Sequence, residues 1–86
     1  MKVRLDLFGA FRSHDPAATL ELDVPEGARV ADLRQALDAH AREHWPGYRP
    51  ELLKASAFAS ETTVLRDAEP LPAGVAMAVL PPVSGG

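Results

Sequence analysis

The sequence contains no cysteine. This absence excludes a disulfide framework, a catalytic thiolate and a metal site built from cysteine ligands. Long apolar runs are also missing, since no stretch approaches the roughly 20 residues that a membrane-spanning helix needs, and the first residues lack the pattern of a signal peptide. We therefore expect a cytoplasmic protein with no membrane partner.

The chain also lacks an excess of basic residues. Nine Lys and Arg face twelve Asp and Glu, for a net charge of −3, and the basic residues are scattered along the chain. A nucleic-acid-binding domain normally gathers them into a patch, so we expect no nucleic-acid partner. The glycines before the last two are isolated, so there is no glycine-rich loop to cradle a phosphate, and we expect no bound cofactor.

Two short motifs resemble catalytic sites. The stretch HAREH runs from His40 to His44 and fits the H-x-x-E-H pattern of inverzincin metalloproteases. A protease also needs a third ligand and a cleft, and histidines favour the negative end of a helix dipole in any case. Ser13, His14 and Asp15 are the residue types of a hydrolase triad, but neighbours in one turn cannot adopt its geometry. We expect a solvated helix end, a solvated turn and no metal site.

Hydrophobic periodicity predicts the fold. Residues 2–9 and 19–25 alternate apolar and polar side chains, which is typical of two half-buried strands that pair antiparallel. Residues 28–45 change to a period of 3.6 and predict one amphipathic helix. Shorter strands are expected at residues 54–60, 62–67 and 75–80. This order predicts an α+β fold of the β-grasp (ubiquitin-like) type for residues 1–80, a mixed sheet with its first and last strands central and one helix packed across one face.

Residues 81–86, PPVSGG, are expected to form an extended tail. Pro81 and Pro82 cannot donate to a sheet ladder, so they end the last strand. Six residues can reach about 20 Å from the domain. Gly85 and Gly86 have no Cβ, so they can pass through a channel too narrow for any side chain.

The reactive group of such a tail is the α-carboxylate of Gly86, which is ionised at neutral pH. A carboxylate is a poor electrophile and must first be activated, most simply as an acyl-adenylate that another enzyme makes with ATP. Attack by sulfide then gives a thiocarboxylate, and attack by an amine gives an isopeptide bond. The alternative is a flexible tail that is never modified.

Three stretches carry a resemblance to a known family: MKVRLDLFGAFR, LDVPEGARVADLRQAL and PLPAGVAMAVLPPVSGG. Together they resemble the MoaD/ThiS sulfur carriers over nearly the whole chain, and the PPVSGG ending is the most specific part. The resemblance implies a carrier that is not an enzyme on its own. Its terminal Gly86 would be adenylated, converted to a thiocarboxylate and used to donate sulfur to the dithiolene of molybdopterin, with the chain as the small subunit of a molybdopterin synthase.

The resemblance also implies partners and contact residues. An adenylating enzyme would use ATP to activate Gly86, and a large catalytic subunit would receive the loaded tail in a heterotetramer. Gly85 would give clearance. The direction and contacts of the tail would depend on Pro81, Pro82, Val83 and Ser84, and docking on the exposed sheet face would depend on Leu80 and Phe58. Thiamine synthesis, tRNA thiolation and protein conjugation remain alternative destinations, and a β-grasp interaction module with an unmodified tail is the alternative of another class.

Overall fold

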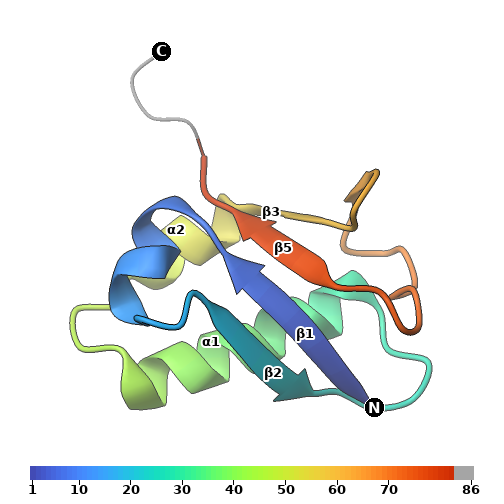
Figure 1. Ribbon diagram of the computed structural model, residues 1–86, viewed down its shortest axis with the longest axis horizontal. Coiled ribbons are helices and arrows are strands. Elements are labelled where there is room, and N and C mark those ends of the chain that lie inside the picture. The colour runs from blue at the N-terminus through green and yellow to red at the C-terminus, as the bar shows by residue number, and fades with distance from the viewer. Residues whose placement is uncertain (83–86) are drawn as a thin grey trace.

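In this computed structural model the described residues are 1–82, and Figure 1 shows a curved sheet with a long helix lying across one face. The elements in chain order are β1 (Lys2–Leu7), the 3₁₀ helix η1 (Gly9–His14), β2 (Thr19–Asp23), α1 (Val30–His44), α2 (Pro50–Lys54), β3 (Ala57–Ala59), β4 (Val64–Leu65) and β5 (Met77–Leu80). Within residues 1–82 the strands form one mixed sheet in the order β2-β1-β5-β3-β4. The predicted α+β, β-grasp fold is confirmed, with the first and last strands in the interior of the sheet.

The pairing of β1 determines where the chain end lies. β1 pairs antiparallel with β2, with Val3 opposite Leu22, and parallel with β5, with Leu7 opposite Val79. Because β1 and β5 run in the same direction, their carboxyl ends lie at the same edge of the sheet. The turn after Leu7 and the segment after Leu80 are therefore neighbours.

Helix α1 is held to the sheet by one apolar stripe. Its fully buried residues are Val30, Leu33, Leu37 and Ala41, a spacing that places them on one face of a 3.6-residue helix. Arg29 precedes α1 at the position where Ser, Thr, Asp or Asn is the usual cap, and Asp32 compensates, because its Oδ2 accepts a hydrogen bond from the Arg29 N–H at 2.8 Å. The helix ends at its predicted place, before Pro46 and Gly47.

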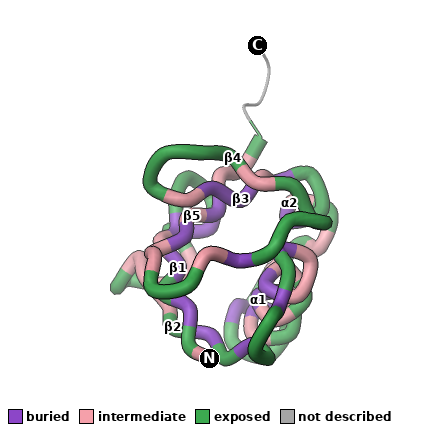
Figure 2. Tube along the Cα trace, turned by 90° about the vertical axis from the view of Figure 1, so that its right-hand side faces the viewer, coloured by how far each residue is buried: buried purple, intermediate pink, exposed green. Residues whose placement is uncertain are grey.

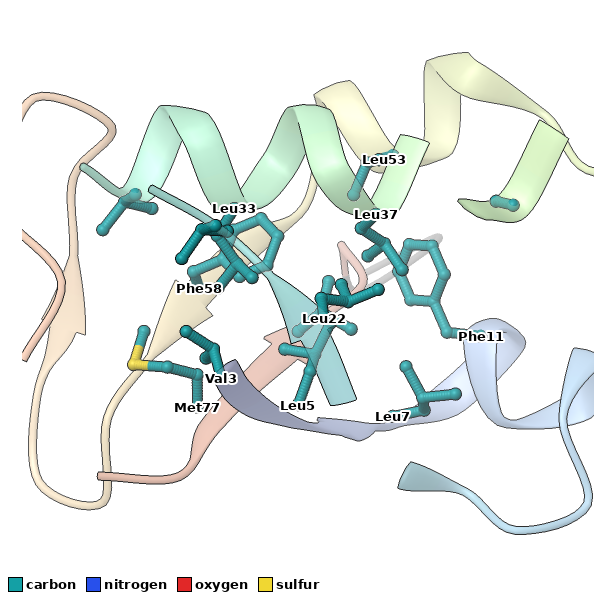
Figure 3. Packing of buried hydrophobic residues seen from close by; sticks show 14 of the residues in the cluster. Val3, Leu5, Leu7, Phe11, Leu22, Leu33, Leu37, Leu53, Phe58 and Met77 are labelled. Carbon is teal, nitrogen blue, oxygen red and sulfur yellow. The ribbon is translucent and has the colours of Figure 1, made fainter. Parts of the chain in front are cut away.

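The core lies between α1 and the inner face of the sheet (Figure 3). Figure 3 shows side chains from β1 and β5 pointing toward Leu33 and Leu37 of α1, with Phe11 of η1 closing one end. Figure 2 shows the buried segments of the strands and of α1 facing one another across this layer. Trp45, directly after α1, is also buried in this cluster.

Two short helices fill connections that carry no clear periodic signal. The loop between the first two strands contains η1, anchored by the buried Phe11, where a turn alone was expected. The connection before the third strand contains α2. The Arg34 guanidinium joins α1 to this region: it donates to the carbonyl oxygens of Leu53 and Ser56 and lies 4.9 Å from the centre of the Phe58 ring.

The described residues contain no helix with both the length and the apolar character needed to cross a bilayer.

Candidate functional site

The face of the sheet opposite α1 carries an exposed apolar strip. Alternation along each strand turns every second residue toward this open face. The apolar strip consists of the exposed Phe8 and Val64, the half-buried Ala57, Ala78 and Leu80, and Ala59, which faces the same side but is only 8% exposed. Phe8 is 43% exposed and Val64 is 61% exposed, unlike the large apolar residues of the core. Exposed apolar side chains that gather on one face are typical of a protein-binding surface.

Strand register makes the apolar strip continuous. Ala59 lies opposite Val64 on one side and opposite Ala78 on the other, which forms one row. Ala57 lies opposite Leu80 in a second row. Phe8 keeps an extended backbone one residue beyond the Leu7–Val79 pair, which places it beside Leu80.

The other half of the open face is charged. On β1 and β2, Lys2 lies opposite Asp23 and Arg4 lies opposite Glu21. Arg4 also makes an ion pair with Asp6 at 3.1 Å. The apolar strip is thus bordered on one side by paired charges of both signs, an arrangement that favours one orientation of a docked partner over others.

The predicted docking role of Phe58 is wrong. Phe58 is fully buried, because it lies opposite the buried Val79 and therefore faces α1. Its neighbour Ala57 takes the outward position. Leu80 does lie on the open face, half-buried beside Ala57, so its docking role stays a prediction.

Sequence reasoning missed Phe8 and Val64. A signal for Phe8 was present, since the alternation in KVRLDLF puts Phe8 on the same side as Lys2, Arg4 and Asp6. Val64 had no comparable signal, because β4 contains only two residues and shows no period.

The tail leaves the domain next to the apolar strip. The ladder between β3 and β5 ends at Leu80, and Pro81 and Pro82 come directly after it, as expected from residues that have no N–H to donate. Val83, Ser84, Gly85 and Gly86 lie outside the described residues, so their roles and the extended form of the tail remain predictions.

Two of the three histidines of the chain pack against its one tryptophan, and the third, His44, lies beside one of these two. The His14 ring stacks on Trp45, with centroids 5.1 Å apart, and His40 meets the same indole edge-on at 5.8 Å. His40 and His44 are 4.5 Å apart. Among residues 1–82 no third side chain of a metal-binding type completes a ligand set with this pair. The half-buried His14 and His40 thus pack against Trp45, where solvated side chains were expected.

This packing makes stability depend on the protonation of His40. Burial, followed by the nearby charge of His44, holds the pKa of His40 below its ordinary value, against the opposite effect of Asp15 and Glu43. A histidine whose pKa is lowered in the folded state stabilises the fold fully above its unfolded pKa of about 6.5 and loses this contribution as the pH falls below it. We expect His40→Gln to show a smaller fall in unfolding temperature than the wild type between pH 7.5 and 5.5.

Trp45 fluorescence during thermal unfolding at each pH measures this difference. His44→Gln is the matched control, because it removes the neighbouring charge and leaves His40 in place. Its own pH dependence should lie between those of the other two proteins. Identical pH profiles for the wild type and His40→Gln would contradict the assignment.

Asp38, Arg42 and Tyr48 form a second titratable cluster, which joins α1 to the loop after it. The carboxylate of Asp38 accepts hydrogen bonds from Tyr48 Oη at 2.7 Å and from Arg42 Nε at 2.8 Å. These two bonds, in that order, hold the pKa of Asp38 below its ordinary value. Burial and the same carboxylate raise the pKa of the Tyr48 hydroxyl. Each group has a structural partner, so the cluster offers no free acid or base.

The candidate site therefore consists of the apolar strip on the open face of the sheet and of the tail, which leaves the domain beside this strip. The model of the ThiS family matches residues 5–86. The chain belongs to the ThiS family.

Individual relatives agree with this ThiS-family assignment over almost the whole chain. A molybdopterin synthase sulfur carrier subunit from Synechococcus elongatus is 39% identical over 89 residues, which covers 98% of this chain and 96% of the relative. Two crystal structures of small archaeal modifier protein 1 (SAMP1) from Haloferax volcanii superimpose with TM-scores of 0.72 and 0.71 at 26% and 24% identity. The first covers 100% of both chains, and the second covers 95% of this chain and 98% of its own.

Proposed function

We propose that this ThiS-family chain is the sulfur carrier subunit of a molybdopterin synthase. The observation that carries the proposal is the 39% identity to a sulfur carrier subunit of that enzyme, which spans nearly all of both chains. The open apolar strip beside the exit of the tail supports it, since a carrier must dock and deliver its chain end to a partner.

The proposed chemistry takes place at the terminal carboxylate of Gly86. One carboxylate oxygen attacks the α-phosphate of ATP in the active site of an adenylating enzyme, which forms an acyl-adenylate and releases pyrophosphate. Sulfide then displaces AMP and leaves a thiocarboxylate. The carrier thus supplies the reacting group, and its partners supply the catalytic side chains.

This chemistry requires two partners. An adenylating enzyme that binds ATP loads the tail, and a large catalytic subunit takes the loaded tail and transfers its sulfur to the molybdopterin precursor. We propose a heterotetramer for the second complex. Both partners must bind the same face, because the tail starts next to the apolar strip.

Intact-mass spectrometry tests the proposal. The chain is incubated with a ThiS-family adenylating enzyme, ATP and a sulfur source. We expect the mass to increase by the difference between one sulfur and one oxygen atom, and to return to its first value when a large synthase subunit and its precursor are added. A mass that never changes, with a loading enzyme shown to be active on another carrier, would contradict the function.

Docking on the apolar strip gives a second expectation. Leu80→Asp places a carboxylate in the strip between Phe8 and Ala57, and burying that charge against a partner is costly. We expect the dissociation constant for the large subunit to rise at least tenfold, which corresponds to about 1.4 kcal/mol. Calorimetry measures the affinity, and thermal unfolding verifies the fold.

Gln35→Asp is the matched control for this change, because Gln35 is exposed on α1, away from the open face. Its affinity should equal that of the wild type. Equal affinities for Leu80→Asp and the wild type would show that the partner binds another face.

Protein conjugation is the second candidate function. It is favoured by the structural similarity to SAMP1, which is named a modifier protein. In that case an amine attacks the adenylate, and adducts joined through Gly86 to lysine side chains would be found in place of the thiocarboxylate.

A further inference from the structure

The first residue of the tail, Pro81, rests on η1. An ideal Cβ built on Gly9, the first residue of η1, would lie 2.6 Å from Cγ of Pro81. Real Cβ atoms do not approach other atoms so closely, so the two residues fit together only because Gly9 has no side chain. The backbone of Gly9 also has a φ of +57°, which glycine adopts without strain.

The second proline, Pro82, is exposed and borders an open pocket beside the same helix. Pro82 lines a cavity of about 500 Å³ together with Ala10, Phe11 and His14. Phe11 is fully buried, and its N–H donates to the Phe8 carbonyl oxygen at 3.2 Å. Pro81 therefore lies against a support that is itself anchored in the core.

The support also connects the tail to the docking face. Gly9 comes directly after Phe8, the most exposed aromatic residue of the apolar strip, and the parallel pairing of β1 and β5 brings this turn beside the end of β5. A docked partner that contacts Phe8 thus touches the residue directly before Gly9, against which Pro81 lies. The φ of each proline is fixed by its ring, so a shift of Pro81 changes the direction of the residues after it.

We infer that Gly9 is a positioning residue that sets the direction in which the tail leaves the domain relative to the docking face. The functional consequence of this inference rests on the proposed function, in which the tail must enter the active site of a partner in the right direction to deliver Gly86. In Gly9→Ala the new Cβ must displace Pro81. A displacement of about 1 Å at a reacting group can cost roughly 100-fold in rate.

The central measurement is the kinetics of loading by the adenylating enzyme. We expect Gly9→Ala to lower kcat about 10- to 100-fold with KM within about twofold of the wild-type value, because docking on the apolar strip is kept. Gly74→Ala is the matched control: Gly74 has a similar φ of +70°, but nothing lies within 4 Å of its Cβ position. It carries the same backbone strain without the contact and should load at the wild-type rate.

A double variant isolates the contact. Pro81→Ala removes the Cγ that Gly9→Ala would strike, so in this background the further change of Gly9 should lower kcat less than about threefold. An equal loss in both backgrounds would overturn the inference. Binding of a chain shortened to residues 1–82 to the large subunit gives another check, since Gly9→Ala should leave this affinity unchanged, and a tenfold loss there would place the effect in docking.

A readout without any partner separates this inference from the proposed function. One-bond Cα–Hα residual dipolar couplings of Pro81 and Pro82 report the orientation of the Pro-Pro step relative to the sheet. We expect these couplings to change in Gly9→Ala and to stay the same in Gly74→Ala. If they change while the wild type never loads, the proposed function fails and the positioning role stands. If they do not change, the positioning role is wrong.

Discussion

Deletion of Gly86 is expected to abolish sulfur loading while leaving the fold intact. The shortened chain still ends in glycine, but its carboxylate lies one residue, about 3.5 Å, further back along the tail. A carboxylate displaced by this distance cannot reach the α-phosphate of ATP in a site where an error of about 1 Å already costs roughly 100-fold. Loading is measured as the increase in intact mass, and we expect no increase above the limit of detection.

A chain of full length with a C-terminal amide is the matched control for length. It keeps all 86 residues but lacks the carboxylate oxygen that attacks ATP, so it should also remain unloaded. Both variants should unfold at the wild-type temperature, since the sheet ladder ends at Leu80. If either variant gained sulfur, the reacting group would have to be elsewhere in the chain.

The fold was largely predictable because its main elements have strong periods. The alternation in residues 2–7 and the 3.6-residue stripe from Val30 to Ala41 each bury one face, and the burial of one face is what determines such elements. The proline and glycine at positions 46 and 47 marked the end of α1. The inner places of β1 and β5 were indicated by their apolar character.

The parts that sequence reasoning missed are short and depend on contacts between distant residues. η1 is anchored by a single buried aromatic residue, Phe11. A single residue cannot produce a periodic pattern in the sequence. β3 has three residues, too few for the pattern to show which side of the sheet Phe58 faces. The support of Pro81 by Gly9 joins residues 72 positions apart (81 − 9), so no local pattern could reveal it.

The candidate site shows the same division. The chemistry proposed for Gly86 follows from the sequence alone, since a terminal glycine carboxylate needs no fold to be recognised, and it stays a prediction. The docking face does not follow from the sequence alone, because the choice between two phenylalanines depends on strand register. Phe8 is 43% exposed and Phe58 is fully buried, although the two residues are chemically identical.

Substitution of these two phenylalanines is expected to give opposite results. Phe58→Ala removes a ring that is enclosed by the core and covered by the Arg34 guanidinium. Such a cavity costs about 3–5 kcal/mol, whereas a chain of this length has a total stability of about 4–13 kcal/mol. We expect the free energy of unfolding of Phe58→Ala to be lower than that of the wild type by about 3–5 kcal/mol, as measured by urea denaturation monitored through Trp45.

Phe8→Ala is the matched control, the same change at an exposed site. We expect a change in unfolding free energy below about 0.5 kcal/mol, together with a dissociation constant for the large subunit that rises at least tenfold, because aromatic residues dominate binding surfaces of this kind. Phe58→Leu keeps most of the buried volume, so it should fold and bind the partner with wild-type affinity. Weaker binding by folded Phe58→Leu, with normal binding by Phe8→Ala, would reverse the assignment and return the docking role to Phe58.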